Sequence, residues 1–206
     1  MSEGRTLVID SASEACSVAL FEDERLVGHV HELVGRGHAE RLVPMIADLM
    51  KGRSATSILV GVGPGSFTGI RVAIAAAYGL AIGWSAELKG MSSLALLAAG
   101  VSQERAVAAA VTGGHGELFV QEFGAITAGP TAGIRNLVPA EAARFVTAPL
   151  VIGSGARQLV AERGWGEARD DWPSARNALK IPAQLRSLAA KPVYARAPDA
   201  RIPEAA

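Results

Sequence analysis

The sequence predicts an α/β protein of two consecutive units, each a five-stranded mixed sheet flanked by helices, with the second unit shortened and degenerate. Two observations support this prediction. The first hundred residues alternate short apolar runs of strand length with longer segments of helical periodicity. The second half repeats the theme with fewer strong strands and with frequent glycine and proline between residues 124 and 139. We place the boundary near residues 102–105, which gives domains of residues 1–104 and 105–206.

Three strands are expected first, over residues 5–11, 16–21 and 26–33. The polar group from Glu22 to Arg25 supplies a tight connection, so the strands form an antiparallel meander. A helix follows over residues 38–51, with Gly52 after its last turn. Pro44 lacks an N–H group and suits the first turn of a helix, which favours a start nearer Glu40.

The run from Ile58 to Val62 is continuously apolar, as expected for a strand buried on both faces. After it we expect a glycine-rich turn, a helix over residues 69–83, a strand over 88–91 and a helix over 93–99. The second half predicts a hairpin over 106–123, a helix over 139–146, a strand over 150–153, helices to about residue 190 and a tail. The element order of the first half is that of the ribonuclease H-like unit of actin-like ATPases, an analogy that concerns the fold alone.

Composition excludes several classes of protein. Half of the 206 residues are apolar and there is one cysteine, which excludes a disordered tail and a disulfide scaffold. The 20 basic residues balance 20 acidic ones, so we expect no basic stripe for direct binding of nucleic acid or of an anionic membrane. The start MSEGRTL is unlike a signal peptide, and the longest apolar run, Val72–Trp84, is shorter than the roughly 20 residues of a membrane crossing. We expect a cytoplasmic protein.

The segment after the first strand is a candidate phosphate loop. Asp10 ends the strand and is followed by the small hydroxyl residues Ser11 and Ser13, whose backbone N–H groups could cradle a phosphate. The alternative is a turn in which Asp10 and Ser11 satisfy only local backbone donors.

A second candidate loop lies between the buried strand and the next helix. Glycines and a proline fix its backbone, and the helix N-terminus favours an anion. It is neither a P-loop, because no Gly-Lys-Ser/Thr follows, nor a nucleophile elbow, because Pro64 stands two residues before Ser66. Ser66 or Thr68 is expected to cap the helix. The candidate residues of this loop are Gly63, Gly65, Ser66, Thr68 and Gly69.

These segments carry a resemblance to a known family. LVIDSASEACSVAL, GHAERLVPMI and ILVGVGPGSFTGIRVAIAAAYGLA, in this order, resemble the TsaB (YeaZ) family of tRNA threonylcarbamoyladenosine biosynthesis proteins. The resemblance is strong over residues 6–99. It continues more weakly in Gly116–Phe119, Ile152–Ala156 and Pro192–Arg196. The chain departs from the family before Gly116, where Val111–His115 stands in place of an Asp-Ala-Arg stretch.

The resemblance implies an actin-like ATPase fold and a non-catalytic subunit. Such a subunit pairs with the catalytic paralogue TsaD, which transfers a threonylcarbamoyl group to the adenosine next to the anticodon. It works with the ATPase TsaE in the complex, reaches tRNA indirectly and forms a homodimer when alone. No cofactor is required by this chain, and binding of ATP or ADP is left open within the complex. The sequence is consistent with a non-catalytic role. His38 is followed one helical turn later by Leu42, and a single imidazole cannot hold a metal ion.

The first two helices are the expected partner surface. The second helix has small residues all round, which lets another helix approach its backbone closely. Burial inside the monomer accounts for at least one of its sides. The interface candidates, chosen by position, are Met45, Leu49, Arg71, Ala76 and Tyr78.

Two alternatives stay open. A stand-alone ATPase or phosphotransferase of the sugar-kinase type is supported by Asp10, Ser11 and the glycine loop, but the turn Thr112–Gly114 supplies no catalytic carboxylate. His29 and His31 share a strand face and could place two metal ligands together, but no third ligand stands nearby. We expect them on a solvated face, and we predict no metal site.

Overall fold

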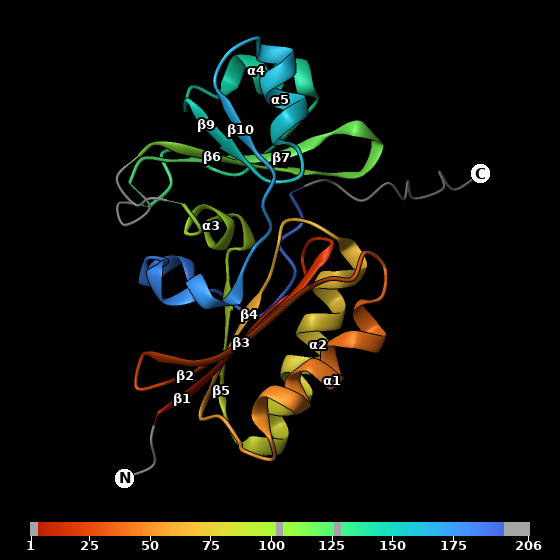
Figure 1. Cartoon of the computed structure of the whole chain (residues 1–206), viewed down its shortest axis with the longest axis vertical. Coiled ribbons are helices and arrows are strands. Elements are labelled where there is room, and N and C mark those ends of the chain that lie inside the picture. Colours follow the sequence, from red (N-terminus) through yellow and green to blue (C-terminus); the bar gives the residue numbers. More distant parts are fainter. Residues whose placement is uncertain (1–3, 102–104, 126–128, 196–206) are drawn as a thin grey trace, which may run out of the picture.

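The computed structural model describes residues 4–101, 105–125 and 129–195. Two five-stranded sheets with helices form two units stacked along the long axis of the molecule (Figure 1). Most of the predicted boundary, residues 102–104, and the tail from residue 196 lie outside the described residues.

The two sheets have the same topology. The first has the order β3-β2-β1-β4-β5 and the second the order β10-β9-β6-β7-β8, so β6–β10 take the places of β1–β5. In each sheet the first three strands in chain order pair antiparallel with one another. The last two strands then extend the sheet by parallel pairing on the other side of the first strand. The predicted fold class is confirmed. The strands are β1 Arg5–Asp10, β2 Ala15–Glu22, β3 Arg25–Leu33, β4 Ser57–Gly61, β5 Glu87–Met91, β6 Val107–Thr112, β7 Leu118–Phe123, β8 Arg135–Leu137, β9 Leu150–Ile152 and β10 Glu167–Arg169.

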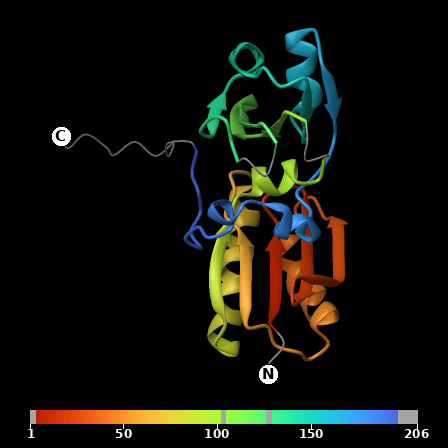
Figure 2. The ribbon, with the colours of Figure 1, turned by 90° about the vertical axis from the view of Figure 1, so that its left-hand side faces the viewer.

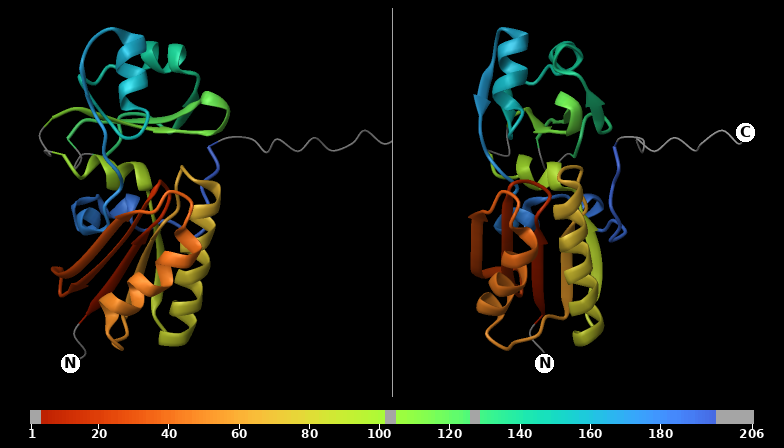
Figure 3. Two further views of the ribbon diagram at one scale, coloured as in Figure 1. Left: turned by 45° about the vertical axis from the view of Figure 1, so that its right-hand side comes forward. Right: turned by 90° about the vertical axis from the view of Figure 1, so that its right-hand side faces the viewer.

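Helices and sheets alternate in five layers. Helices α1 and α2 cover the outer face of the first sheet (Figure 3), and α4 and α5 cover the outer face of the second. Between the sheets lie α3 and η3, which pack with both inner faces in one central core. The helices are α1 His38–Met50, α2 Phe67–Trp84, α3 Ser93–Ala98, α4 Pro139–Phe145 and α5 Ala156–Arg163, with short 3-10 turns η1 Gly114–Gly116, η3 Ala175–Lys180 and η4 Ala183–Leu185.

Alternation along the strands assigns side chains to the layers. In β1, Leu7 and Ile9 pack under α1 and α2, whereas Val8 between them faces the central core. In β6, Ala108 and Ala110 face α4 and α5, whereas Ala109 faces the central core. Both sheets are therefore apolar on two faces, as the continuous apolar runs indicate.

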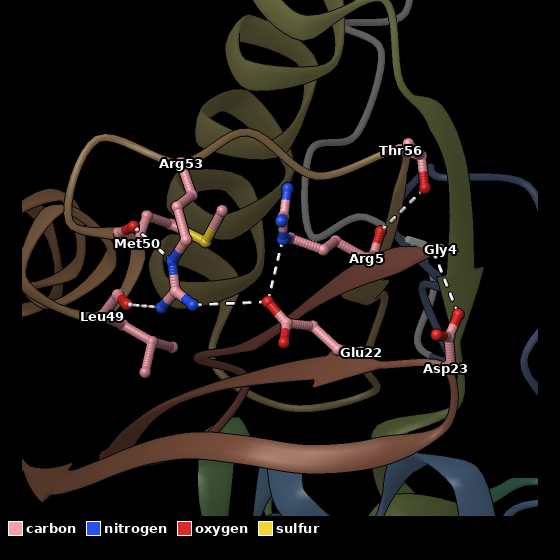
Figure 4. Close-up of polar contacts among 8 residues, drawn as sticks. All are labelled: Gly4, Arg5, Glu22, Asp23, Leu49, Met50, Arg53 and Thr56. Carbon is pink, nitrogen blue, oxygen red and sulfur yellow. Dashed lines mark hydrogen bonds and ion pairs between the residues drawn. The ribbon is translucent and has the colours of Figure 1, made fainter. Parts of the chain in front are cut away.

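Helix α1 begins at His38, as the predicted range 38–51 has it, and the alternative start nearer Glu40 is wrong. Pro44 lies inside the helix on its exposed face, where the carbonyl of Glu40, left without an N–H partner, can meet water. At the other end, Arg53 donates from Nη2 to the carbonyl of Leu49 and from Nε to that of Met50 (Figure 4). Arg5 and Arg53 both reach Glu22 Oε1, at 2.9 and 3.3 Å, and so tie the helix end to the sheet.

The second half differs from the prediction at two places. Strand β8 lies in the segment predicted as loop, and the helices expected as far as residue 190 end at Arg163. Gly164 and Gly166 have positive φ angles of 78° and 96°, which end the helix and lead into β10. In place of the expected helices, the described residues beyond β10 contain only the short 3-10 turns η3 and η4.

The chain returns to the first unit after β10. Figure 2 shows the blue segment with η3 and η4 lying across the first sheet. Gly90 of β5 and Leu188 exchange two backbone hydrogen bonds, and the Val193 N–H donates to the Val62 carbonyl at 2.8 Å. A division of the chain at residue 104 therefore assigns to the second domain a segment that packs on the first sheet.

Candidate functional site

The two predicted loops meet at one edge of the first sheet. Strands β1 and β4 are parallel neighbours, so their carboxyl ends lie side by side. The Ser66 N–H donates to the Ala12 carbonyl at 2.7 Å, and Ser11 Oγ donates to the Gly69 carbonyl at 2.8 Å. The Ser66 N–H and the Ser11 hydroxyl therefore hydrogen-bond between the two loops, and neither is free to donate to a phosphate.

Asp10 is fully buried beneath these loops. Its Oδ1 accepts from the Ala12 N–H at 3.0 Å, and its Oδ2 accepts from Ser93 Oγ at 2.6 Å. Burial raises the pKa of Asp10 to about 6, although the hydrogen bonds from Ser93 and Ala12 oppose this shift. Ser93 at the start of α3 also accepts from the Gly63 N–H at 3.2 Å, so this hydroxyl joins three segments. Sequence patterns did not point to Ser93, because it belongs to α3 and lies more than 80 residues after Asp10 in the chain.

Glycine is required where the loops touch. A Cβ on Gly65 would lie 1.9 Å from the Ala12 carbonyl oxygen, and one on Gly69 would lie 1.9 Å from that of Ser11. Ser66 Oγ accepts from the Gly69 N–H at 3.2 Å, which confirms Ser66 as the helix cap. Thr68 is exposed on the first turn of α2. Ser13 Oγ accepts from the Ala15 N–H at 3.1 Å, as in a local turn.

A small cavity lies where the two units face each other above these loops. Its volume is about 100 Å³, and Ser13, Gly65 and Ser66 form one wall. The second unit contributes Thr112, whose N–H donates to Ser154 Oγ at 3.0 Å, and Trp172. Ligand sites for drug-sized molecules typically measure about 300–1,000 Å³, so the cavity falls short of a nucleotide.

His38 supports the first loop. Its side chain is buried at the start of α1, and its Nε2 lies 2.7 Å from the Ser13 carbonyl oxygen. Over the described residues, no group of three or more histidine, cysteine or acidic side chains is arranged to hold a metal ion.

His29 and His31 do not lie on a solvated face, so that prediction is wrong. Their rings stack with centroids 6.0 Å apart, half-buried where η3 crosses β2 and β3. His29 Nε2 lies 3.2 Å from Ser17 Oγ and 3.1 Å from Ser174 Oγ. Burial, together with the smaller effects of the nearby His31 and Arg176, lowers the pKa of His29 to about 4. Sequence alternation could not reveal the segment that covers this face, because it lies some 145 residues away along the chain.

This burial predicts acid sensitivity. His29 titrates near 6.5 when unfolded and near 4 when folded, so between these values the unfolded chain binds the extra proton. The free energy of unfolding therefore falls as the pH is lowered through this window, by about 1–2 kcal/mol once partial exposure of the ring is allowed for. We expect the free energy of unfolding of H29Q, measured by urea denaturation from pH 7 to pH 4, to lack the part of this fall that comes from His29.

The comparison with H29Q isolates the histidine. Asp10 contributes with the opposite sign over pH 4 to 6, because its pKa is raised in the folded state, but it does so equally in both proteins. Identical pH profiles for the wild type and H29Q would contradict the assignment.

The interface candidates divide into two groups. Met45 and Leu49 are buried among the core residues under α1, which corrects their choice as partner contacts. Ala76 is half-buried, whereas Arg71 and Tyr78 are exposed on α2. The most exposed apolar side chain of α2 is that of Ile82, which is 80% exposed and was not among the candidates.

Helix α2 is apolar on two sides. On one side, Ile70, Ala73 and Ala77 pack into the core. On the other side, an exposed strip is formed by Ala75, Tyr78, Gly79 and Ile82. By length and composition this is the one helix among the described residues that could cross a membrane, with 33% of it buried inside the structure. Its packing on β4 accounts for the buried side, and the exposed strip stays uncovered.

The comparisons with known proteins identify relatives. The family model for TsaD, tRNA N6-adenosine threonylcarbamoyltransferase, matches residues 20–135, more than half of the chain. The tRNA threonylcarbamoyladenosine biosynthesis protein TsaB of Escherichia coli is 41% identical over 127 residues, which cover 58% of this chain and 54% of that protein. The TsaB protein of Haemophilus influenzae is 38% identical over 98 residues, 45% of this chain and 41% of that one. The alignments thus span about half the length of these relatives.

A solved structure extends the similarity to the second unit. YeaZ from Pseudomonas aeruginosa superposes with a TM-score of 0.78 and 28% identity, over 93% of this chain and 99% of that one. The shared architecture therefore includes the second unit, where the sequence resemblance is weaker.

Proposed function

The chain belongs to the TsaD-like family of the actin-like ATPase superfamily, and within it to the TsaB (YeaZ) group, and on this premise we propose that it is a non-catalytic subunit in the synthesis of threonylcarbamoyladenosine in tRNA. It acts by pairing with the catalytic paralogue TsaD. Its partners in the complex are TsaD and the ATPase TsaE, and it reaches tRNA through them. Alone, it pairs with a second copy.

The exposed strip of α2 is the observation that supports pairing. Tyr78 is 49% exposed and Ile82 80% exposed, and nothing lies within 4 Å of a Cβ placed on Gly79 or Gly83. Small residues next to large apolar ones allow a second helix to approach closely and bury apolar area. The family model for TsaD matches residues 20–135, which include both α1 and α2, so we expect a paralogue of this family to carry corresponding helices.

The closed loops support a non-catalytic role. Backbone N–H groups that hold phosphate in P-loops and related sites must point at the ligand. Here the Ser66 N–H is bonded to Ala12, and Asp10 is bonded by Ala12 and Ser93 beneath the surface. A stand-alone phosphotransferase needs these groups free and a larger cleft. We therefore propose that this chain requires no cofactor, and that any ATP or ADP used by the complex is held with its partners.

One substitution tests the surface. I82K places a charge in the apolar strip without disturbing the core, and we expect affinity for TsaD to fall at least about tenfold. The melting temperature should stay within 2–3 °C, about what an exposed substitution produces. Calorimetric titration of purified TsaD with each variant measures the effect.

V138K is the matched control, because Val138 is an exposed apolar residue of the second unit, 45% exposed. Equal binding by I82K, V138K and the wild type would contradict the α2 surface.

The function itself is tested by assay. We expect TsaD from the same source to co-purify with this chain one to one, and tRNA threonylcarbamoylation with TsaE present to require it. ATP turnover by the isolated chain, together with failure to bind TsaD, would favour the phosphotransferase instead.

A further inference from the structure

An aromatic and cationic cluster stands at the N-terminal end of the exposed α2 strip. Arg71 Cζ lies 3.7 Å from the ring centre of Phe67, one helical turn earlier. Its Nε and Nη2 donate to Tyr194 Oη at 3.3 and 3.0 Å. Phe67 and Tyr194 are themselves 57% and 55% exposed, so the whole cluster lies at the surface.

Tyr194 is brought to this place by the returning chain. The two hydrogen bonds between Gly90 and Leu188 and the bond from Val193 to Val62 fix the segment beside β5. The rings of Tyr194 and Phe67 lie 6.1 Å apart with an angle of 35° between their planes. The guanidinium is thus held by two segments more than 120 residues apart in sequence.

The held guanidinium keeps unused donors. Arginine has five N–H groups, and Tyr194 Oη accepts two of them. The other three are on Nη1 and Nη2, an edge that can bind a carboxylate through two parallel hydrogen bonds. Among the ion pairs of the described residues none involves Arg71. Arg71 is also the single charged residue of α2.

A fixed charge beside an apolar strip favours one class of partner. Arginine and tyrosine dominate the binding energy of many interfaces, and a side chain held in place before binding loses less entropy. We propose that Arg71, positioned by Phe67 and Tyr194, is the specificity-determining residue of the α2 surface and pairs with a carboxylate on the facing helix of TsaD. This inference rests on the proposed pairing with TsaD, and it adds the returning segment 188–194 to the interface as the support of Arg71.

Three variants test the pair. R71Q removes the charge, R71K keeps the charge but not the bidentate edge, and Y194F removes the oxygen that fixes the guanidinium while keeping the ring. We expect R71Q to weaken TsaD binding at least about 30-fold and to flatten the salt dependence of the dissociation constant. R71K and Y194F should lie between R71Q and the wild type. R25Q, an equal change of charge at an exposed site of β3, is the control and should bind as the wild type does.

The outcomes separate the two proposals. Failure of the wild type to bind TsaD overturns the proposed function. Wild-type binding with R71Q unchanged, in affinity and in salt dependence, overturns the role of Arg71 alone. Weakened self-association of R71Q with intact TsaD binding overturns TsaD as the partner of Arg71. Equal melting temperatures for all variants ensure that a loss of affinity reports the interface.

Discussion

Replacement of Gly65 by alanine is expected to destabilise the fold by about 3–5 kcal/mol, enough to unfold many domains. The added methyl group would lie 1.9 Å from the Ala12 carbonyl oxygen and 3.3 Å from the Ala12 side chain. The Ala12 backbone cannot move aside as the end of a flexible side chain can, so the two loops must separate. Separation breaks the hydrogen bond from the Ser66 N–H to Ala12 and uncovers Asp10. Gly65 also has a φ angle of 156°, which side chains rarely adopt.

Urea denaturation of G65A against the wild type measures this loss. G79A is the matched control, because nothing lies within 4 Å of a Cβ at this exposed helical position. Alanine is favoured over glycine inside a helix, so G79A should gain about 0.5–1 kcal/mol. A G65A protein as stable as the wild type would show that the loops are not in contact as described.

Replacement of Leu97 by alanine is expected to cost about 3–4 kcal/mol. Leu97 is 1% exposed in the central core, and α3 supplies side chains to both sheets from this position. Its Cδ2 would lie 2.9 Å from a Cβ on Gly153, so the side chain reaches the loop after β9 in the second unit. The cavity left by the substitution would open between the two units.

Thermal and urea unfolding of L97A measure this cost. L26A removes the same atoms from an exposed site of β3, where Leu26 is 41% exposed, and should change stability by less than about 1 kcal/mol. Equal losses for the two variants would contradict a central core shared by the units.

Long elements were predictable from sequence because their periodicity is local. The first three strands, β4, α2 and the hairpin of β6 and β7 lie within a few residues of their expected positions. Strands β8 and β10 have three residues each, too few to carry an alternating pattern, and pairing with neighbouring strands creates them. The burial of His29 depends on a distant segment, which no local pattern encodes.

The candidate site was predictable as two loops but not as their arrangement. Residue types identified both loops, yet only the fold shows that Ser66 and Ser11 bond across them. Met45 and Leu49 belong to the single apolar face of α1, and such a face normally packs on the core. Their choice as surface residues ignored this preference. Tyr194 is close to Arg71 only because the chain returns past β5.

The central layer has a consequence for dissection of the protein. It is built from α3, which leads into the second unit, and from η3, which belongs to the chain coming back. A fragment ending at residue 104 would keep α1, α2 and α3 but would lose the second sheet and η3, which packs against β1 and β2 in the central core. The first unit is therefore built from two separate stretches of sequence, whereas the strands and outer helices of the second unit all lie between residues 107 and 169. Studies of the first unit in isolation would need the returning segment joined to it by a designed linker.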